Sequence, residues 1–101
     1  MDASPAAVVD LTKYVDETAA DHRPAVRGRR IPIATLAHAA ATHGWTVAEI
    51  AHQFQLTEAQ VAAGLLYYEE HREAIEAAEA VYQQALDDAH DQANHASLLS
   101  G

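Results

Sequence analysis

The stretch TVAEIAHQFQLTEAQVAAGLLYY, residues 46–68, contains the beginnings of two helices and the turn between them. Thr46 is a favourable N-cap, and Glu49 three residues later completes a T-x-x-E capping box. Thr57 and Gln60 repeat this arrangement as T-x-x-Q. We therefore predict a short helix over residues 47–54, a tight turn, and a second helix that begins at Thr57.

A further helix is predicted directly upstream, because IATLAHAAATH places apolar residues at helical spacing and Gly44 provides a C-terminal stop. The inward-facing residues expected on the three helices are Ile33, Leu36, Ala37, Ala40, Ala41, Val47, Ile50, Ala51, Val61, Leu65 and Tyr68. This order of elements is that of a helix-turn-helix unit. The shape by itself does not establish DNA binding.

The residues before these helices predict a small β element. LTKYVDE, residues 11–17, fits a short strand or an extended arm, and Pro24 then biases Arg23 away from helix. Residues 25–32 predict a second short strand, because Gly28 permits a turn and Pro32 is compatible with an edge strand. Residues 1–13 are expected to be a flexible N-terminus.

Residues 69–97 lack Pro and Gly and are rich in strong helix formers. One helix over residues 57–95 would be about 58 Å long at about 1.5 Å per residue, which exceeds the size of a compact domain of this length. Apolar residues form a stripe along it, and we expect these to bind a partner: Tyr68, Ile75, Ala78, Tyr82, Ala85 and Leu86. The stripe could cover a groove on another protein, form a homodimeric coiled coil, or fold back on its own domain.

Together these patterns predict a mainly α fold. It comprises a short N-terminal β element, a helix-turn-helix-like three-helix core and a long C-terminal helix. Residues 14–68 are expected to form the core with its strands, and residues 69–101 an acidic helical extension.

The composition excludes several classes of protein. The chain has 101 residues and no cysteine, so disulfides, thiolate metal sites and cysteine nucleophiles are excluded. No apolar run approaches the roughly 18 residues of a membrane helix, and the N-terminal residues lack the basic region of a signal peptide. We therefore expect a cytoplasmic protein that does not bind membranes.

The formal net charge of −9 is unevenly distributed. Residues 22–68 hold four arginines against two glutamates, whereas residues 69–101 hold eight acids against one arginine. The candidate nucleic-acid-binding residues are Arg23, Arg27, Arg29 and Arg30, although they could equally pair with the chain's many acids. Of these, Arg30 is expected to have a structural partner and Arg29 to be exposed.

The third helix offers little to a DNA duplex. Its outer face is expected to present Thr57, Glu58, Gln60 and Gly64, with no positive side chain. Helix-mediated reading of DNA is therefore disfavoured, and the arginine cluster remains the better candidate.

Neither a metal site nor an active site is expected. The seven histidines lack the spacing of metal ligands; His38 and His43, like His90 and His95, lie five residues apart. The chain has no Gly-rich phosphate loop and no convergent acid–base pair. We predict no catalytic residue, no cofactor and no enzymatic activity.

Residues 14–70 closely resemble the small bacterial family called domain of unknown function 433. The matching positions are Pro24, Val26, Gly28, Arg30, Ile31, Pro32, Ile33, Gly44, Thr46, Glu49, Ile50, Leu56, Thr57, Val61, Leu65 and Tyr67. The resemblance implies a homeodomain-like or winged helix-turn-helix fold, and an antitoxin encoded beside a PIN-like nuclease. Arg29, where the family usually has threonine, and the long acidic tail depart from the family pattern.

The functional hypothesis that follows is an antitoxin-like regulator. It would bind a PIN-like toxin nuclease through its C-terminal helix and bind promoter DNA as a dimer. The alternative is a homo-oligomeric adaptor that binds a protein partner without binding DNA.

Overall fold

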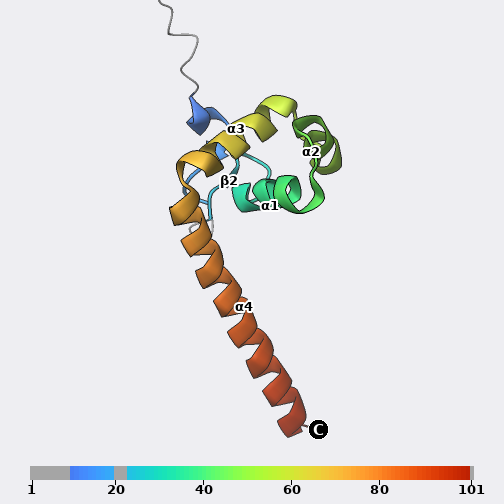
Figure 1. The fold of residues 1–101 in the computed structure, drawn as a ribbon. Coiled ribbons are helices and arrows are strands. Elements are labelled where there is room, and N and C mark those ends of the chain that lie inside the picture. The colour runs from blue at the N-terminus through green and yellow to red at the C-terminus, as the bar shows by residue number, and fades with distance from the viewer. Residues whose placement is uncertain (1–9, 20–22, 101) are drawn as a thin grey trace, which may run out of the picture.

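The computed structural model describes residues 10–19 and 23–100, and it confirms a mainly helical fold with a short β element and a long C-terminal helix (Figure 1). The elements in chain order are the 3₁₀-helix η2 (Leu11–Lys13), β1 (Val15–Asp16), β2 (Ala25–Val26), α1 (Ile33–His43), α2 (Val47–Phe54), α3 (Glu58–Glu70) and α4 (Arg72–Ser100). Helices α1, α2 and α3 pack together with the β element, and α4 extends away from them.

The β element is shorter than predicted. β1 and β2 pair antiparallel, with Val15 opposite Val26, and an isolated bridge joins Ala25 to Pro32. Residues 11–13, expected to be flexible or extended, instead form η2 with Leu11 buried. Asp10 stabilises this turn because its carboxylate accepts a hydrogen bond from the backbone N–H of Thr12 at 3.1 Å. The predicted flexible residues 1–9 lie outside the described residues.

Both predicted capping boxes are confirmed. The Thr46 hydroxyl accepts from the Glu49 N–H at 3.2 Å, and the Glu49 carboxylate accepts from the Thr46 N–H at 2.8 Å. Thr57 and Gln60 exchange the same two bonds at the start of α3. Gly44 ends α1 in the left-handed region at φ 67°, as expected. These caps satisfy backbone groups at the helix ends, and because they depend on neighbouring residues, the sequence alone predicted the helix-turn-helix unit.

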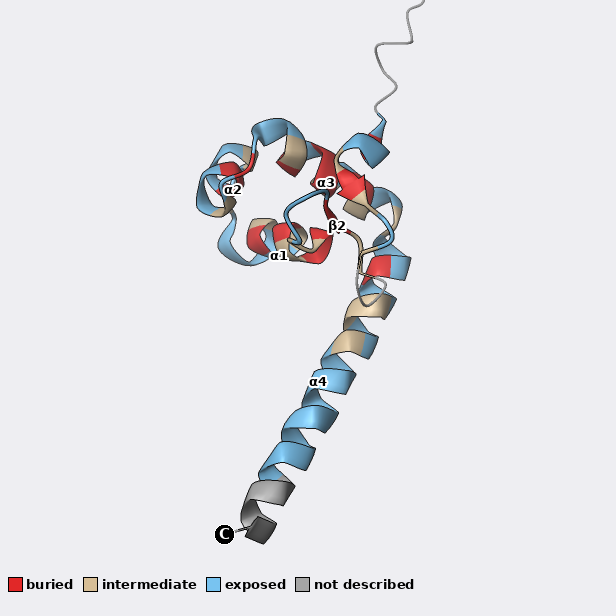
Figure 2. Ribbon diagram, turned by 180° about the vertical axis from the view of Figure 1, so that it is seen from behind, coloured by how far each residue is buried: buried red, intermediate tan, exposed pale blue. Residues whose placement is uncertain are grey.

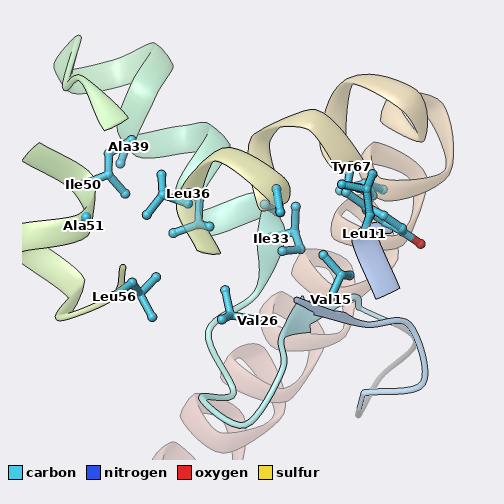
Figure 3. Packing of buried hydrophobic residues seen from close by; sticks show 14 residues of the cluster. Leu11, Val15, Val26, Ile33, Leu36, Ala39, Ile50, Ala51, Leu56 and Tyr67 are labelled. Atoms are coloured by element: carbon cyan, nitrogen blue, oxygen red, sulfur yellow. The ribbon is translucent and has the colours of Figure 1, made fainter. Parts of the chain in front are cut away.

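The core lies between α1, α2, α3 and the β element (Figure 3). Its largest fully buried side chains are Ile33, Leu36, Ile50, Val15, Val26 and Val61. On α1, Ala34 and Ala39 are buried in place of Ala37 and Ala40, which are half-buried, and Ala41, which is exposed. The buried face of α1 is therefore rotated relative to the face predicted from spacing.

Gly64 is buried, so its predicted place on the exposed face of α3 is wrong. A Cβ at this position would lie 2.8 Å from Leu36 Cδ1 and 3.1 Å from Ile33 Cδ1. Glycine is needed here because α1 and α3 approach closely.

The sequence left open whether one helix runs unbroken past Tyr68, and the structure shows a break: α3 ends at Glu70 and α4 begins at Arg72. His71 leaves helical geometry at φ −126° and ψ 29°, and its ring stacks on the Tyr67 ring with centroids 4.0 Å apart. The chain changes direction at this point (Figure 1), and Ile75 one turn later is buried in the core with 3% of its surface exposed. Burial of Ile75 thus accompanies the interruption of the helix.

Helix α4 then leaves the domain. Its first turns include buried and half-buried residues, whereas the residues further along are exposed (Figure 2). The molecule measures 70 × 24 × 23 Å along its principal axes. The elongation comes from α4, as predicted for a helix that outruns its own domain.

Candidate functional site

The arginine turn, residues 27–30, is a tight exposed loop between β2 and α1. The Val26 N–H donates to the Ile31 carbonyl at 2.7 Å, and the Arg29 N–H donates to the Val26 carbonyl at 3.0 Å. Gly28 and Arg30 both have positive φ, at 80° and 57°. These left-handed residues close the loop and keep its arginines on the surface.

Two of these arginines support the fold. Arg27 donates from Nε to the Thr12 carbonyl at 3.0 Å and from Nη2 to the Val15 carbonyl at 3.1 Å. Arg29 donates to the last carbonyls of α2, at 2.6 Å to Gln55 and 3.2 Å to Phe54. A cation at a helix C-terminus is favourable because it satisfies carbonyls and complements the helix dipole.

Arg30 has no hydrogen bond or ion pair with any residue of the described segments. The sequence had suggested the opposite assignment, with a structural partner for Arg30. Arg30 instead adopts a left-handed backbone conformation, at φ 57°.

Arg23 precedes β2 and holds α4 against the domain, and it lines a surface depression together with Gly28 and Arg30 of the arginine turn. Its Nε and Nη2 donate to the two carboxylate oxygens of Glu79 at 2.6 and 3.1 Å, and its Cζ lies 3.7 Å from the centre of the Tyr82 ring. The hydrogen bond from Arg23 to Glu79 raises the pKa of the guanidinium. Arg23 is therefore engaged within the chain and not presented as a surface charge for phosphate.

Helix α3 carries no lysine or arginine. Glu58, Ala59 and Ala62 are exposed along it, and Leu66 is 43% exposed. Its amide side chain, Gln60, is half-buried and accepts from the Thr57 N–H in the capping box, so it is engaged in the fold.

The predicted partner-binding stripe divides into two parts. In the first part Ile75 is buried, and Tyr68, Ala78 and Tyr82 are half-buried against the chain's own domain. The Tyr68 hydroxyl also donates to Glu76 at 2.7 Å. These residues pack the first three or so turns of α4 against the chain's own domain. Over these turns the stripe therefore folds back on its own domain, one of the three alternatives considered from the sequence.

The second part, residues 83–94, is exposed throughout and is called the distal segment below. It includes Ala85 and Leu86, of which Leu86 is 46% exposed. Three aspartates lie within it, and no lysine or arginine follows Arg72 in the chain. The distal segment is thus an acidic helix with part of an apolar stripe uncovered.

Sequence reasoning missed two features of the structure. One is Glu79 of α4, which binds Arg23; its position three residues before Tyr82 on the same helix face was the available signal. The other is a hollow between α1 and α2 lined by Trp45 and Phe54, the only tryptophan and the only phenylalanine of the chain. Their rarity was a signal, but helical spacing alone does not show that two helices leave a hollow between them.

Among the described side chains, those of residues 10–19 and 23–94, no group of three or more His, Cys, Asp or Glu is arranged to hold a metal ion. None of the described helices is both long enough and apolar enough to cross a membrane.

The fold defines a class: a small helix-turn-helix-like domain with a β element before it and a projecting helix after it. The family model described as protein of unknown function (DUF433) matches residues 15–68, and the chain belongs to that family. The match covers the core and stops where the projecting helix is about to begin. No curated protein and no solved structure shows significant similarity to this chain.

Proposed function

We propose that this protein is an antitoxin-like regulator whose distal segment binds a protein partner. The observation that carries the proposal is the exposure of every residue from 83 to 94 on a helix that continues past its own domain. Following the family resemblance, the partner is a PIN-like nuclease.

The distal segment, residues 83–94, is short enough that as a helix it is marginally stable when nothing packs against it. Isolated helices shorter than about 12–15 residues are marginal in water, and most helical stability in proteins comes from packing of an apolar face. A groove that buried Ala85 and Leu86 would supply that packing. The acidic residues around them favour a basic groove, such as the nucleic-acid-binding face of a nuclease.

The regulator would also contact nucleic acid through the arginine turn, because α3 offers no suitable side chains. Arg30 carries a charge that no described residue neutralises, and Arg27 and Arg29 retain unused N–H donors. Such contacts with phosphates weaken steeply as salt concentration rises.

The alternative is a homo-oligomeric adaptor that uses the same segment. A parallel coiled coil of two copies would bring Asp87, Asp88 and Asp91 of each chain near their equivalents, without a lysine or arginine in the segment to offset the repulsion. Light scattering across salt concentrations tests this alternative, since a dimer that formed only at high salt would show that charge opposes self-association.

The protein-binding proposal is tested by co-expression with the product of the adjacent reading frame. Leu86→Arg changes the distal segment, and Leu66→Arg is a matched control because the two leucines are similarly exposed, at 46% and 43%. We expect Leu86→Arg to abolish co-purification and Leu66→Arg to retain it. No complex with the unaltered chain, or equal capture of both variants, would refute the proposal.

A further inference from the structure

A hollow lies between α1 and α2, away from α4. It has a volume of about 350 Å³ and is lined by Thr35, His38, Ala39, Thr42, His43, Trp45 and Phe54. Neither the docking of α4 nor the arginine turn accounts for it.

The hollow is aromatic at one side. The rings of His43 and Trp45 stack with centroids 4.6 Å apart and planes inclined by 29°. Trp45 and Phe54 are only half-buried, so they contribute to the surface as well as to the core. A stacked pair of rings is a platform that a third planar ring can extend, since aromatic pairs favour offset stacking.

Polar groups line the other side. Thr35, His38 and Thr42 lie on one face of α1, at spacings of three and four residues, and His43 joins the lining at the C-terminal end of the helix. Their hydroxyls and ring nitrogens can donate or accept hydrogen bonds. Although the chain holds fifteen acids, no carboxylate of a described residue lines the hollow. An uncharged heterocycle therefore fits this lining better than a cation does.

Positive charge lies at the end of α2 that closes the hollow. The Arg29 guanidinium donates to the carbonyl of Phe54, which itself lines the hollow. Arg30, the next residue, does not line this hollow but a separate surface depression that includes Gly28 and Pro32. The aromatic lining and the arginine turn thus share Phe54 as a common boundary. A ligand with a planar ring and a neighbouring phosphate matches both features.

We infer that the domain formed by α1, α2, α3 and the arginine turn binds single-stranded nucleic acid. An unpaired base occupies the hollow and stacks on the His43–Trp45 pair, the adjoining phosphate contacts Arg29, and a further phosphate along the strand contacts Arg30. A strand is favoured over a duplex because the bases of a duplex are already stacked on one another, and α3 carries no side chains suited to reading base edges. The inference deepens the nucleic-acid half of the proposed function and is independent of the protein-binding half.

Trp45 is the only tryptophan, so its fluorescence reports directly on the hollow. The full chain is titrated at low salt with a mixed-sequence DNA strand of about 12 nucleotides, a length that covers a typical site. The same strand annealed to its complement and a free mononucleotide are titrated in parallel. We expect saturable quenching by the strand, with affinity roughly tenfold or more above that of the duplex, which is within the range of base–aromatic stacking.

Arg30→Asn removes the charge while keeping a residue that tolerates the left-handed backbone at φ 57°. We expect it to weaken strand binding several-fold and to flatten the salt dependence. Arg72→Gln is the matched control, because Arg72 is an exposed arginine that pairs with Glu69 and does not line the hollow. It should leave the affinity unchanged.

Three outcomes would overturn the inference: no saturable quenching by the strand, equal affinity for strand and duplex, or equal losses in Arg30→Asn and Arg72→Gln. Equal quenching by the mononucleotide at the same concentration would also overturn it, because a strand would then gain nothing from its phosphates. Duplex binding through the arginine turn would leave the proposed function standing, so the two failures are distinguishable.

Discussion

The contact of Arg23 with Glu79 and Tyr82 should be a measurable source of stability, because it joins the loop before β2 to the base of α4. The guanidinium makes two hydrogen bonds to the carboxylate, at 2.6 and 3.1 Å, and lies 3.7 Å from the centre of the tyrosine ring. The side chains of Arg23 and Glu79 are 16% and 31% exposed. The perturbation is a double-mutant cycle made of Arg23→Gln, Glu79→Gln and both together.

Hydrogen bonds to charged groups contribute about 1.5–3 kcal/mol, and a cation over an aromatic ring contributes about 0.5–2 kcal/mol. Solvent reaches both partners and screens the ion pair, so the lower end of each range applies. We expect Arg23→Gln to lower the free energy of unfolding by about 2 kcal/mol, with a coupling between Arg23 and Glu79 of about 1 kcal/mol.

Urea unfolding followed by far-UV circular dichroism and by Trp45 fluorescence measures these quantities. Arg23→Lys is the control; it keeps the charge but lacks the planar fork, so its stability should fall between those of the unaltered chain and Arg23→Gln. Additivity of the two single substitutions within about 0.5 kcal/mol would refute the reasoning, because uncoupled residues behave in that way.

Three further predictions concern residues of the domain formed by α1, α2, α3 and the β element. Gly64→Val should lower the free energy of unfolding by about 2 kcal/mol, because even a Cβ there would lie 2.8 Å from Leu36 Cδ1; unchanged thermal unfolding would contradict the close helix crossing. Arg29→Ala should cost roughly 0.5–1 kcal/mol by removing the cation from the C-terminus of α2, and hydrogen exchange should rise in the last turn of that helix; equal exchange in both chains would count against this capping role. Burial, together with a hydrogen bond to Glu17, raises the pKa of Tyr67 to about 12 from 10.0. Because the folded state raises this pKa above its unfolded value, the protonated Tyr67 hydroxyl stabilises the folded state. This stabilisation is fully present below pH 10.0 and is lost as pH rises toward about 12. Urea titrations across that window should show a shallower loss in Tyr67→Phe than in the unaltered chain, and parallel losses would exclude Tyr67 as the source.

Local signals in the sequence predicted the core of the fold because they act over three or four residues. Thr46 and Thr57 mark helix starts through hydrogen bonds to nearby backbone groups, and Gly44 marks a helix end through its left-handed conformation. The interruption at His71 has no such signal. The residues around it are good helix formers, and the break coincides with tertiary contacts made by Tyr67 and Ile75.

The candidate site shows the same division. Composition and spacing located the arginine cluster and the apolar stripe, but not what each side chain contacts. A guanidinium reaches several ångströms from its backbone, so its partner can be any carbonyl or carboxylate that the fold brings near. The fold brings Glu79 to Arg23, 56 residues away in the chain, and the end of α2 to Arg29.

The sequence by itself determined the helix-turn-helix core, the acidic projecting helix and the family, because capping, periodicity and charge are properties of neighbouring residues. Only the tertiary structure decided that Arg23 docks α4, that Arg30 rather than Arg29 lacks a partner among the described residues, and that Trp45 and Phe54 line one hollow. These facts depend on how helices cross and where long side chains end, and such distances are set by packing across the whole domain.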